Sequence, residues 1–271
     1  MTLGYQDLIS NSLKTHLEKI KNSGKEETIT FYIEDYKGEM SINEYYLLNE
    51  KRSKKENSII INSTGHNLSD KKYIRSIFSN LDQIIDLDFK EISHNNGSQI
   101  DIYSISSSSS FNENIIGQVI SQETENGAWF DLLWKEDLDT KLETSSLEKS
   151  TIIHELGHTF GLSHPKNDPT NINWTTEDTV MSYNKPEGKW SEWFSELDLL
   201  ALKSMWGREN DSGIMNFENI FSSYQFSKSS SNKYFIDTLT GIENITTLKS
   251  IKFKDQEVNV SKDIINIFDK L

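Results

Sequence analysis

The sequence predicts an α+β protein in which helices pack on a sheet and a small β-rich appendage follows. Alternating apolar residues, as in Ile29, Phe31 and Ile33, indicate strands, because successive side chains of a strand point to opposite faces. Apolar residues at helical spacing, such as Ile74 and Ile77, indicate amphipathic helices. With 271 residues, the chain is long enough for one sizeable domain and an appendage.

The elements follow in order along the chain. Residues 6–22 predict a helix, and Ser69 is expected to cap a second one. We interpret the charged residues 49–57 as a solvated loop rather than a nucleic-acid-binding patch, and the serine-rich residues 104–110 as a mobile loop. Strands are expected at residues 29–33, 58–62, 87–89, 100–103, 117–122 and 127–134.

Two further helices are marked by their caps. Ser145 and Glu148 have the spacing of a capping box, in which each side chain binds the other residue's backbone amide. Apolar residues between positions 152 and 160 would anchor this helix to the sheet. Ser195 is expected to cap a last helix that ends at Gly207.

The helix that follows Ser145 carries a group of potential metal ligands. His154 and His158 are four residues apart, so their side chains share one helix face and could bind one zinc ion. Gly161 permits a left-handed turn that would bring His164 back to the same metal as a third ligand. A fourth position would stay open for water, as in catalytic zinc sites.

Glu155 follows the first ligand and would act as a general base toward a water at the metal. The alternative is a helix that carries these residues by coincidence. The chain has only six histidines, so three of them at these offsets, with the Glu and the Gly, make a coincidence rare.

This motif resembles the HExxHxxGxxH pattern of the metzincin zinc endopeptidases, and the likeness extends over about residues 58–208. Met181 lies seventeen residues after His164, in a sequence similar to the family's Met-turn, which forms an apolar floor beneath the metal. Pro165 and the tripeptide at residues 181–183 resemble the serralysins within that family. By this resemblance, Tyr183 is a movable zinc ligand that swings aside to hydrogen-bond the oxyanion; a packing role is its alternative.

The resemblance implies a zincin-like catalytic domain with a twisted, mixed, five-stranded sheet that is mostly parallel. One antiparallel edge strand, for which residues 117–122 are our candidate, would bind an extended peptide beside the zinc. It also implies hydrolysis of peptide bonds, with one catalytic Zn²⁺ on His154, His158 and His164.

The chain departs from serralysins at both ends. It has only 13 glycines and no glycine-rich calcium-binding repeats, so structural calcium stays open. We expect an N-terminal extension at residues 1–57, a catalytic domain at residues 58–210 and the β-rich appendage at residues 211–271. The extension is either a pro-segment that plugs the cleft or an added structural layer.

Composition limits the partners and the cofactors. There are no cysteines, so disulfides, a cysteine nucleophile and a cysteine-based zinc site are excluded. The net charge of −14 argues against nucleic acid and anionic membranes as partners. We expect a monomer that acts on a protein or peptide substrate.

Two other functions and one other location stay open. The chain could be a catalytically silent zinc-containing binding or scaffold protein, or a processing protease of narrow specificity. No conventional signal peptide and no apolar run long enough to cross a membrane is visible. Because serralysins are commonly exported by a C-terminal signal, we expect a secreted or extracellular protein, with the cytoplasm as the alternative. The remaining histidines, His16, His66 and His94, are expected at the surface.

Overall fold

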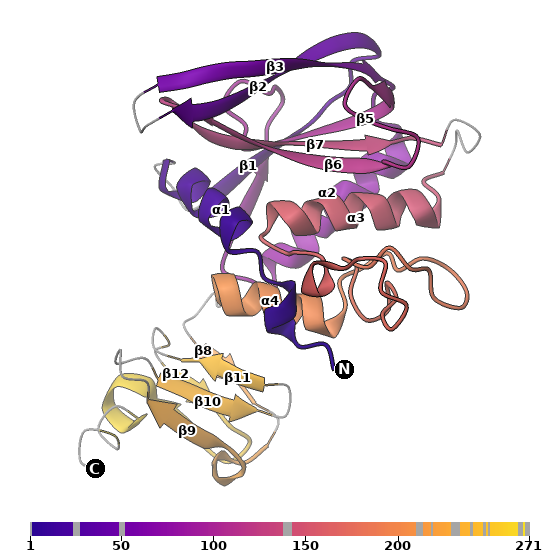
Figure 1. Ribbon diagram of the computed structural model, residues 1–271. Coiled ribbons are helices and arrows are strands. Elements are labelled where there is room, and N and C mark those ends of the chain that lie inside the picture. Colours follow the sequence, from indigo (N-terminus) through magenta and orange to yellow (C-terminus); the bar gives the residue numbers. More distant parts are fainter. Residues whose placement is uncertain are drawn as a thin grey trace. The chain divides into compact units, whose positions relative to one another are not determined.

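The chain forms two compact units, Met1–Met205 and Trp206–Leu271 (Figure 1). The computed structural model describes residues 2–23, 28–48, 52–137, 143–209, 214–217, 219–228, 234–238, 241–245, 248, 250–264 and 268. The first unit contains a mixed sheet with helices packed against it, and the second contains two small sheets. The prediction of an α+β protein is therefore confirmed.

Five strands of the first unit form a continuous layer in the order β4-β1-β5-β7-β6. β1 (Thr28–Ile33) pairs in parallel with β4 (Asp88–Glu91) and with β5 (Ile100–Ser108). β5 pairs in parallel with β7 (Gly127–Lys135), and β6 (Gly117–Thr124) pairs with β7 in the antiparallel direction. The prediction that residues 117–122 form an antiparallel edge strand is confirmed in the described chain.

A long hairpin adds two more strands. β2 (Gly38–Leu48) pairs antiparallel with β3 (Arg52–Ser63), and β3 pairs antiparallel with the last part of β5. In the described chain the sheet thus has seven strands, and three of its six strand pairings are antiparallel, so the predictions of five strands and of a mostly parallel sheet are wrong. Residues 52–57 belong to β3 instead of the expected loop, because pairing with β2 satisfies their backbone; residues 49–51 lie outside the described residues.

The described residues among 1–57 belong to the first unit, and their strands are part of its sheet. β1 lies between β4 and β5, and residue 57 lies within β3. The described chain divides near residue 205 instead, within α4 (Glu196–Trp206).

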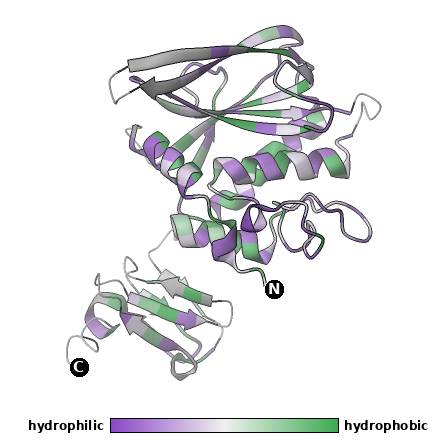
Figure 2. Cartoon of the chain, viewed as in Figure 1, coloured by the Kyte–Doolittle hydropathy of each residue, from purple (hydrophilic) through white to green (hydrophobic). Residues whose placement is uncertain are grey.

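Helices cover one face of the sheet. Phe31 of β1 stacks on Phe78 of α2 (Leu68–Asp82), with ring centroids 3.8 Å apart. On the same face, His16 of α1 (Asn11–Ser23) contacts Phe130 of β7, with ring centroids 4.7 Å apart. Apolar residues lie both in the central strands and in the helices that cover them (Figure 2).

The hairpin covers the opposite face. Its residues Ile42, Ile59 and Ile61 belong to one buried cluster with Tyr103 and Leu133, which are paired neighbours on β5 and β7. Helices and hairpin therefore bury both faces of the central strands, which explains why β7 is apolar at almost every position.

Two local predictions are wrong. The cap of α2 is Asn67 and not Ser69, because the Asn67 side chain accepts a hydrogen bond from the Asp70 amide at 2.9 Å. Ser104 to Ser108 lie in β5 and not in a mobile loop, since the register with β7 continues to Ile105 and that with β3 to Ser108.

The second unit has its own core. β10 (Tyr234–Thr238) lies between β9 (Gln225–Lys228) and β11 (Gly241–Asn244) in an antiparallel sheet. β12 (Ser250–Lys252) lies between β8 (Ile214–Asn216) and β13 (Glu257–Asn259). The buried cluster includes Ile236, Ile245, Ile251 and Phe253.

His16 and His66 are buried, so their predicted surface position is wrong; His94 is exposed as expected. His66 Nδ1 lies 2.8 Å from the Glu34 carbonyl oxygen, to which it must donate. Its Nε2 accepts a hydrogen bond of 3.0 Å from Trp134 Nε1. Only the neutral ring can make both bonds, and burial lowers the pKa of His66 to about 4.

We expect this histidine to make the first unit less stable in acid. Between pH 6.5 and about 4 the unfolded chain binds a proton that the folded chain does not, so stability falls as pH falls through this window. Wild type should lose up to about 3 kcal/mol more than His66→Gln over this range. Urea unfolding of chelator-treated protein, followed by tryptophan fluorescence, measures this difference. His94→Gln is the matched control, and coincident pH profiles of wild type and His66→Gln would contradict the prediction.

Candidate metal centre and catalytic cleft

α3 (Ser146–Thr159) carries the first two histidines and is capped as predicted. The Ser145 hydroxyl accepts from the Glu148 amide at 3.2 Å, and the Glu148 carboxylate accepts from the Ser145 amide at 2.7 Å. At the other end, Gly161 has φ 98°, a left-handed conformation that glycine adopts without strain. The amides of Gly161 and Leu162 donate to the carbonyls of His158 and Gly157, a Schellman ending that turns the chain back.

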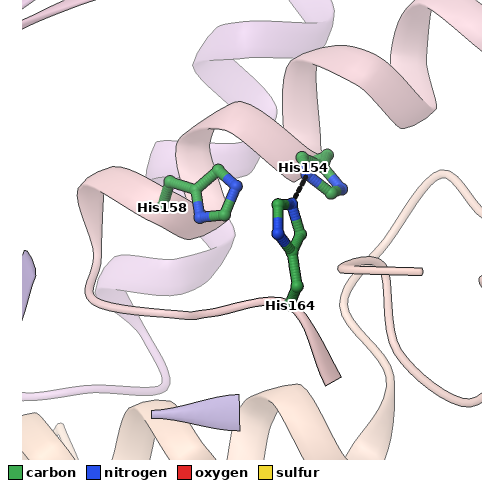
Figure 3. A group of neighbouring side chains, drawn as sticks. All are labelled: His154, His158 and His164. Carbon is green, nitrogen blue, oxygen red and sulfur yellow. Dashed lines mark hydrogen bonds between the residues drawn. The ribbon is translucent and has the colours of Figure 1, made fainter. Parts of the chain in front are cut away.

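This turn brings the three predicted ligands together (Figure 3). His154 and His158 project from α3, and His164 approaches them from the returning loop. Their ligand atoms all lie within 4.8 Å of one another, and the Nε2 atoms of His154 and His164 are 3.3 Å apart. Tetrahedral zinc with Zn–N distances of about 2.0–2.1 Å places its ligand atoms about 3.3 Å apart. The three imidazoles can therefore hold a metal ion.

Backbone carbonyls orient two of these rings. His154 Nδ1 lies 2.8 Å from the Val180 carbonyl oxygen, and His158 Nδ1 lies 2.9 Å from that of Leu162. A ring that donates from Nδ1 keeps the lone pair of Nε2 for a metal, and such partners also fix the ring's orientation.

Burial keeps the ligands neutral. It lowers the pKa of His154 and His164, and it lowers that of His158 to about 4. Neutral imidazole is the form that binds metals.

The predicted Met-turn lies directly beneath α3. Met181 is fully buried, and a Cβ built on Gly157 would come 2.8 Å from its sulfur. Glycine at position 157 therefore allows the helix to approach the methionine closely. Met181 thus packs against α3 at Gly157, the residue before His158, and its role as a floor beneath a metal stays a prediction.

Asp198 holds this turn and is not among the residues predicted from the sequence. Its buried carboxylate accepts from the Val180 amide at 2.9 Å, the Thr179 hydroxyl and the Ser195 amide. Asp198 follows the predicted cap Ser195 by three residues, which is the spacing of a capping box. This spacing is a signal in the sequence from which the role of Asp198 at the cap can be predicted. Because Val180 also binds His154, Asp198 acts on the centre through the backbone.

Glu155 is buried beside the histidines and lines the cleft. Burial raises its pKa to about 8, whereas a cation held by the adjacent histidines would favour the ionised carboxylate. A Cβ built on Gly117, the first residue of β6, would come 2.7 Å from Glu155 Cδ. Glycine at position 117 therefore makes room for the Glu155 carboxylate, with which any larger residue would clash in this geometry.

A cleft of about 590 Å³ extends from Glu155 along α3 and the start of β6. The cleft lies between the edge strand and the Met-turn, and His154 is one of its lining residues. Its apolar lining residues are Ile115, Ile116, Leu147, Tyr183 and Trp190. The cleft can accept an apolar side chain next to the metal centre.

Tyr183 lies over the histidines. Its ring centroid is 5.4 Å from that of His154 and 5.1 Å from that of His164, and half of the residue is exposed. Burial of the remainder raises its pKa, and so does the charge of Glu155. The structure thus brings Tyr183 to the predicted place, while its role at the metal stays a prediction.

The sequence matches no protein-family model and no curated protein. No helix in the described part of the chain has the length and apolar character needed to cross a membrane.

We expect His164→Ala to reduce the metal affinity at least about a hundredfold, because it removes one of three ligands while α3 stays intact. Competition between the protein and a chromophoric chelator for Zn²⁺ measures this affinity. His94→Ala replaces an exposed histidine outside the centre and should bind the metal like wild type. Equal affinities of the two variants would exclude His164 as a ligand.

Proposed function

We propose that this chain is a zinc-dependent endopeptidase of the metzincin group, similar to the serralysins. The observation that carries the proposal is the convergence of three imidazoles with a neighbouring carboxylate at the wall of a cleft. Three nitrogen ligands suit zinc in a catalytic site, in which the fourth position remains for water.

The fold supports the same proposal. Four parallel strands and an antiparallel edge strand precede α3, and the turn with Met181 follows α3 and packs against it at Gly157. This is the arrangement that the resemblance to metzincins implies.

The edge strand gives the proposed substrate its binding mode. In the described chain, β6 pairs with β7 and has no strand on its other side. An extended peptide can add to such an edge through backbone hydrogen bonds. Since β6 begins at Gly117, next to Glu155, a peptide bound there would place a carbonyl group at the metal centre.

A zinc ion at the three histidines would act as a Lewis acid that makes a water molecule more acidic. Glu155 accepts the proton of this water and later donates it to the leaving amine. The Tyr183 hydroxyl, which lies on the cleft side of the histidines, donates a hydrogen bond to the oxyanion of the substrate carbonyl. The apolar walls of the cleft bind a substrate side chain and exclude water.

We expect Glu155→Gln to bind Zn²⁺ like wild type but to lower kcat/KM by about 10²–10⁴ or more, because it removes only the general base. Peptide hydrolysis and zinc content, measured on the same sample, separate the two effects. Glu39→Gln changes an exposed glutamate of β2 and should keep full activity. An active Glu155→Gln enzyme would refute the proposed mechanism.

A digest of a diverse peptide library, with and without chelator and read by mass spectrometry, tests the function itself. Chelator-sensitive cleavage at many sites is the expected result. A single cleavage site would favour the narrow processing protease. No cleavage by zinc-loaded protein would favour the silent binding or scaffold protein. The secreted location and the monomeric state stay predictions.

A further inference from the structure

Residues 2–10 run alongside the loop that carries His164. The Leu8 carbonyl accepts from the Ser163 amide at 2.7 Å, and the Ser10 amide donates to the Gly161 carbonyl at 2.9 Å. Between these two bonds, Ile9 forms an antiparallel bridge with Leu162. The N-terminal segment therefore fixes three consecutive residues of the loop just before the third ligand.

These contacts lead directly to two of the three ligands. The Leu162 carbonyl is the partner of His158 Nδ1, and Ser163 is the residue before His164. Leu8 and Leu162 are fully buried, so apolar packing adds to the backbone bonds. A shift of this loop would move His164 and would remove the carbonyl that orients His158.

The residues after His164 are attached to the same segment. Lys166 and Asn167 have φ of 50° and 60°, left-handed conformations that side-chain-bearing residues adopt reluctantly. The Lys166 ammonium donates to the Thr2 carbonyl at 3.0 Å and lies 3.6 Å from the Asp7 carboxylate. Strained backbone of this kind persists where the surroundings hold it, and residues 2–7 supply part of that support.

We propose that residues 2–10 are a positioning clamp for the metal centre, which holds His164 and the Leu162 carbonyl in the geometry that binds the metal. The proposal rests on the proposed metal site and adds a role for the N-terminal segment. None of these residues lines the cleft, so this part of the segment supports the site instead of plugging it.

Two buried leucines provide a matched test. Leu8→Ala should weaken Zn²⁺ binding about 10- to 100-fold, the usual effect of losing support behind a metal ligand. Leu17→Ala removes an equally buried leucine of α1, away from the loop, and should keep the wild-type affinity despite a comparable loss of stability. Chelator competition with Zn²⁺ alone, below the unfolding temperature of every variant, measures both affinities.

Hydrogen exchange of peptides covering residues 161–164, recorded on the chelator-treated protein, gives a second readout. Leu8→Ala should increase exchange in this loop far more than Leu17→Ala does. If Leu8→Ala fails to fold, Lys166→Met at a partly exposed position removes the contacts to Thr2 and Asp7 and should show the same two effects in weaker form.

Equal affinities and equal exchange in the clamp variants and Leu17→Ala would overturn the proposal. Neither readout requires catalysis, so a protein that binds zinc but cleaves no peptide would refute the endopeptidase proposal and leave the clamp intact. A wild-type protein that binds no zinc would refute the metal site, and the exchange measurement would still decide whether residues 2–10 hold the loop.

Discussion

The structure depends on one constraint: two imidazole rings must each present Nε2 to a common point, and their Nδ1 atoms therefore need fixed acceptors. Both acceptors are backbone carbonyls outside α3, at Val180 for His154 and at Leu162 for His158. The Asp198 carboxylate accepts a hydrogen bond from the Val180 amide and so fixes the first acceptor. Leu162, the second acceptor, belongs to the loop that pairs with residues 8–10. Segments from three parts of the chain thus determine the geometry of one motif.

Glycines make the close approaches in this arrangement possible. Gly157 lets α3 approach the Met181 sulfur, and Gly117 leaves room for the Glu155 carboxylate. At either position a Cβ would meet atoms at less than 3 Å in the present geometry, so the helix, the floor or the edge strand would have to shift. These positions have no chemistry of their own, yet they determine how closely α3 approaches Met181 and β6 approaches Glu155.

The sequence predicted the features that depend on local spacing. Residues only a few positions apart are enough to predict the capping box at Ser145, the turn at Gly161 and the grouping of the three histidines. The strands with clear alternation of apolar residues are predicted from local sequence in the same way. Long-range contacts explain the failures. The charged start of β3 forms a strand because β2 pairs with it, and His66 is buried because Trp134 and the Glu34 carbonyl satisfy its ring. Neither partner can be read from the surrounding residues.

Gln122 joins β6 to the hairpin on the part of the strand that lies away from Gly117. Its buried amide donates to the Asn43 carbonyl and to Asp131, and its oxygen accepts from the Tyr45 amide. These side-chain bonds tie the later half of β6 to β2 although the two strands do not pair with each other. The later half of β6 is thus bonded to the hairpin, whereas the beginning of β6, at Gly117, lines the cleft. We therefore place the proposed peptide-binding edge at the end of β6 that lies beside Glu155, where Gly117 and Gln118 line the cleft.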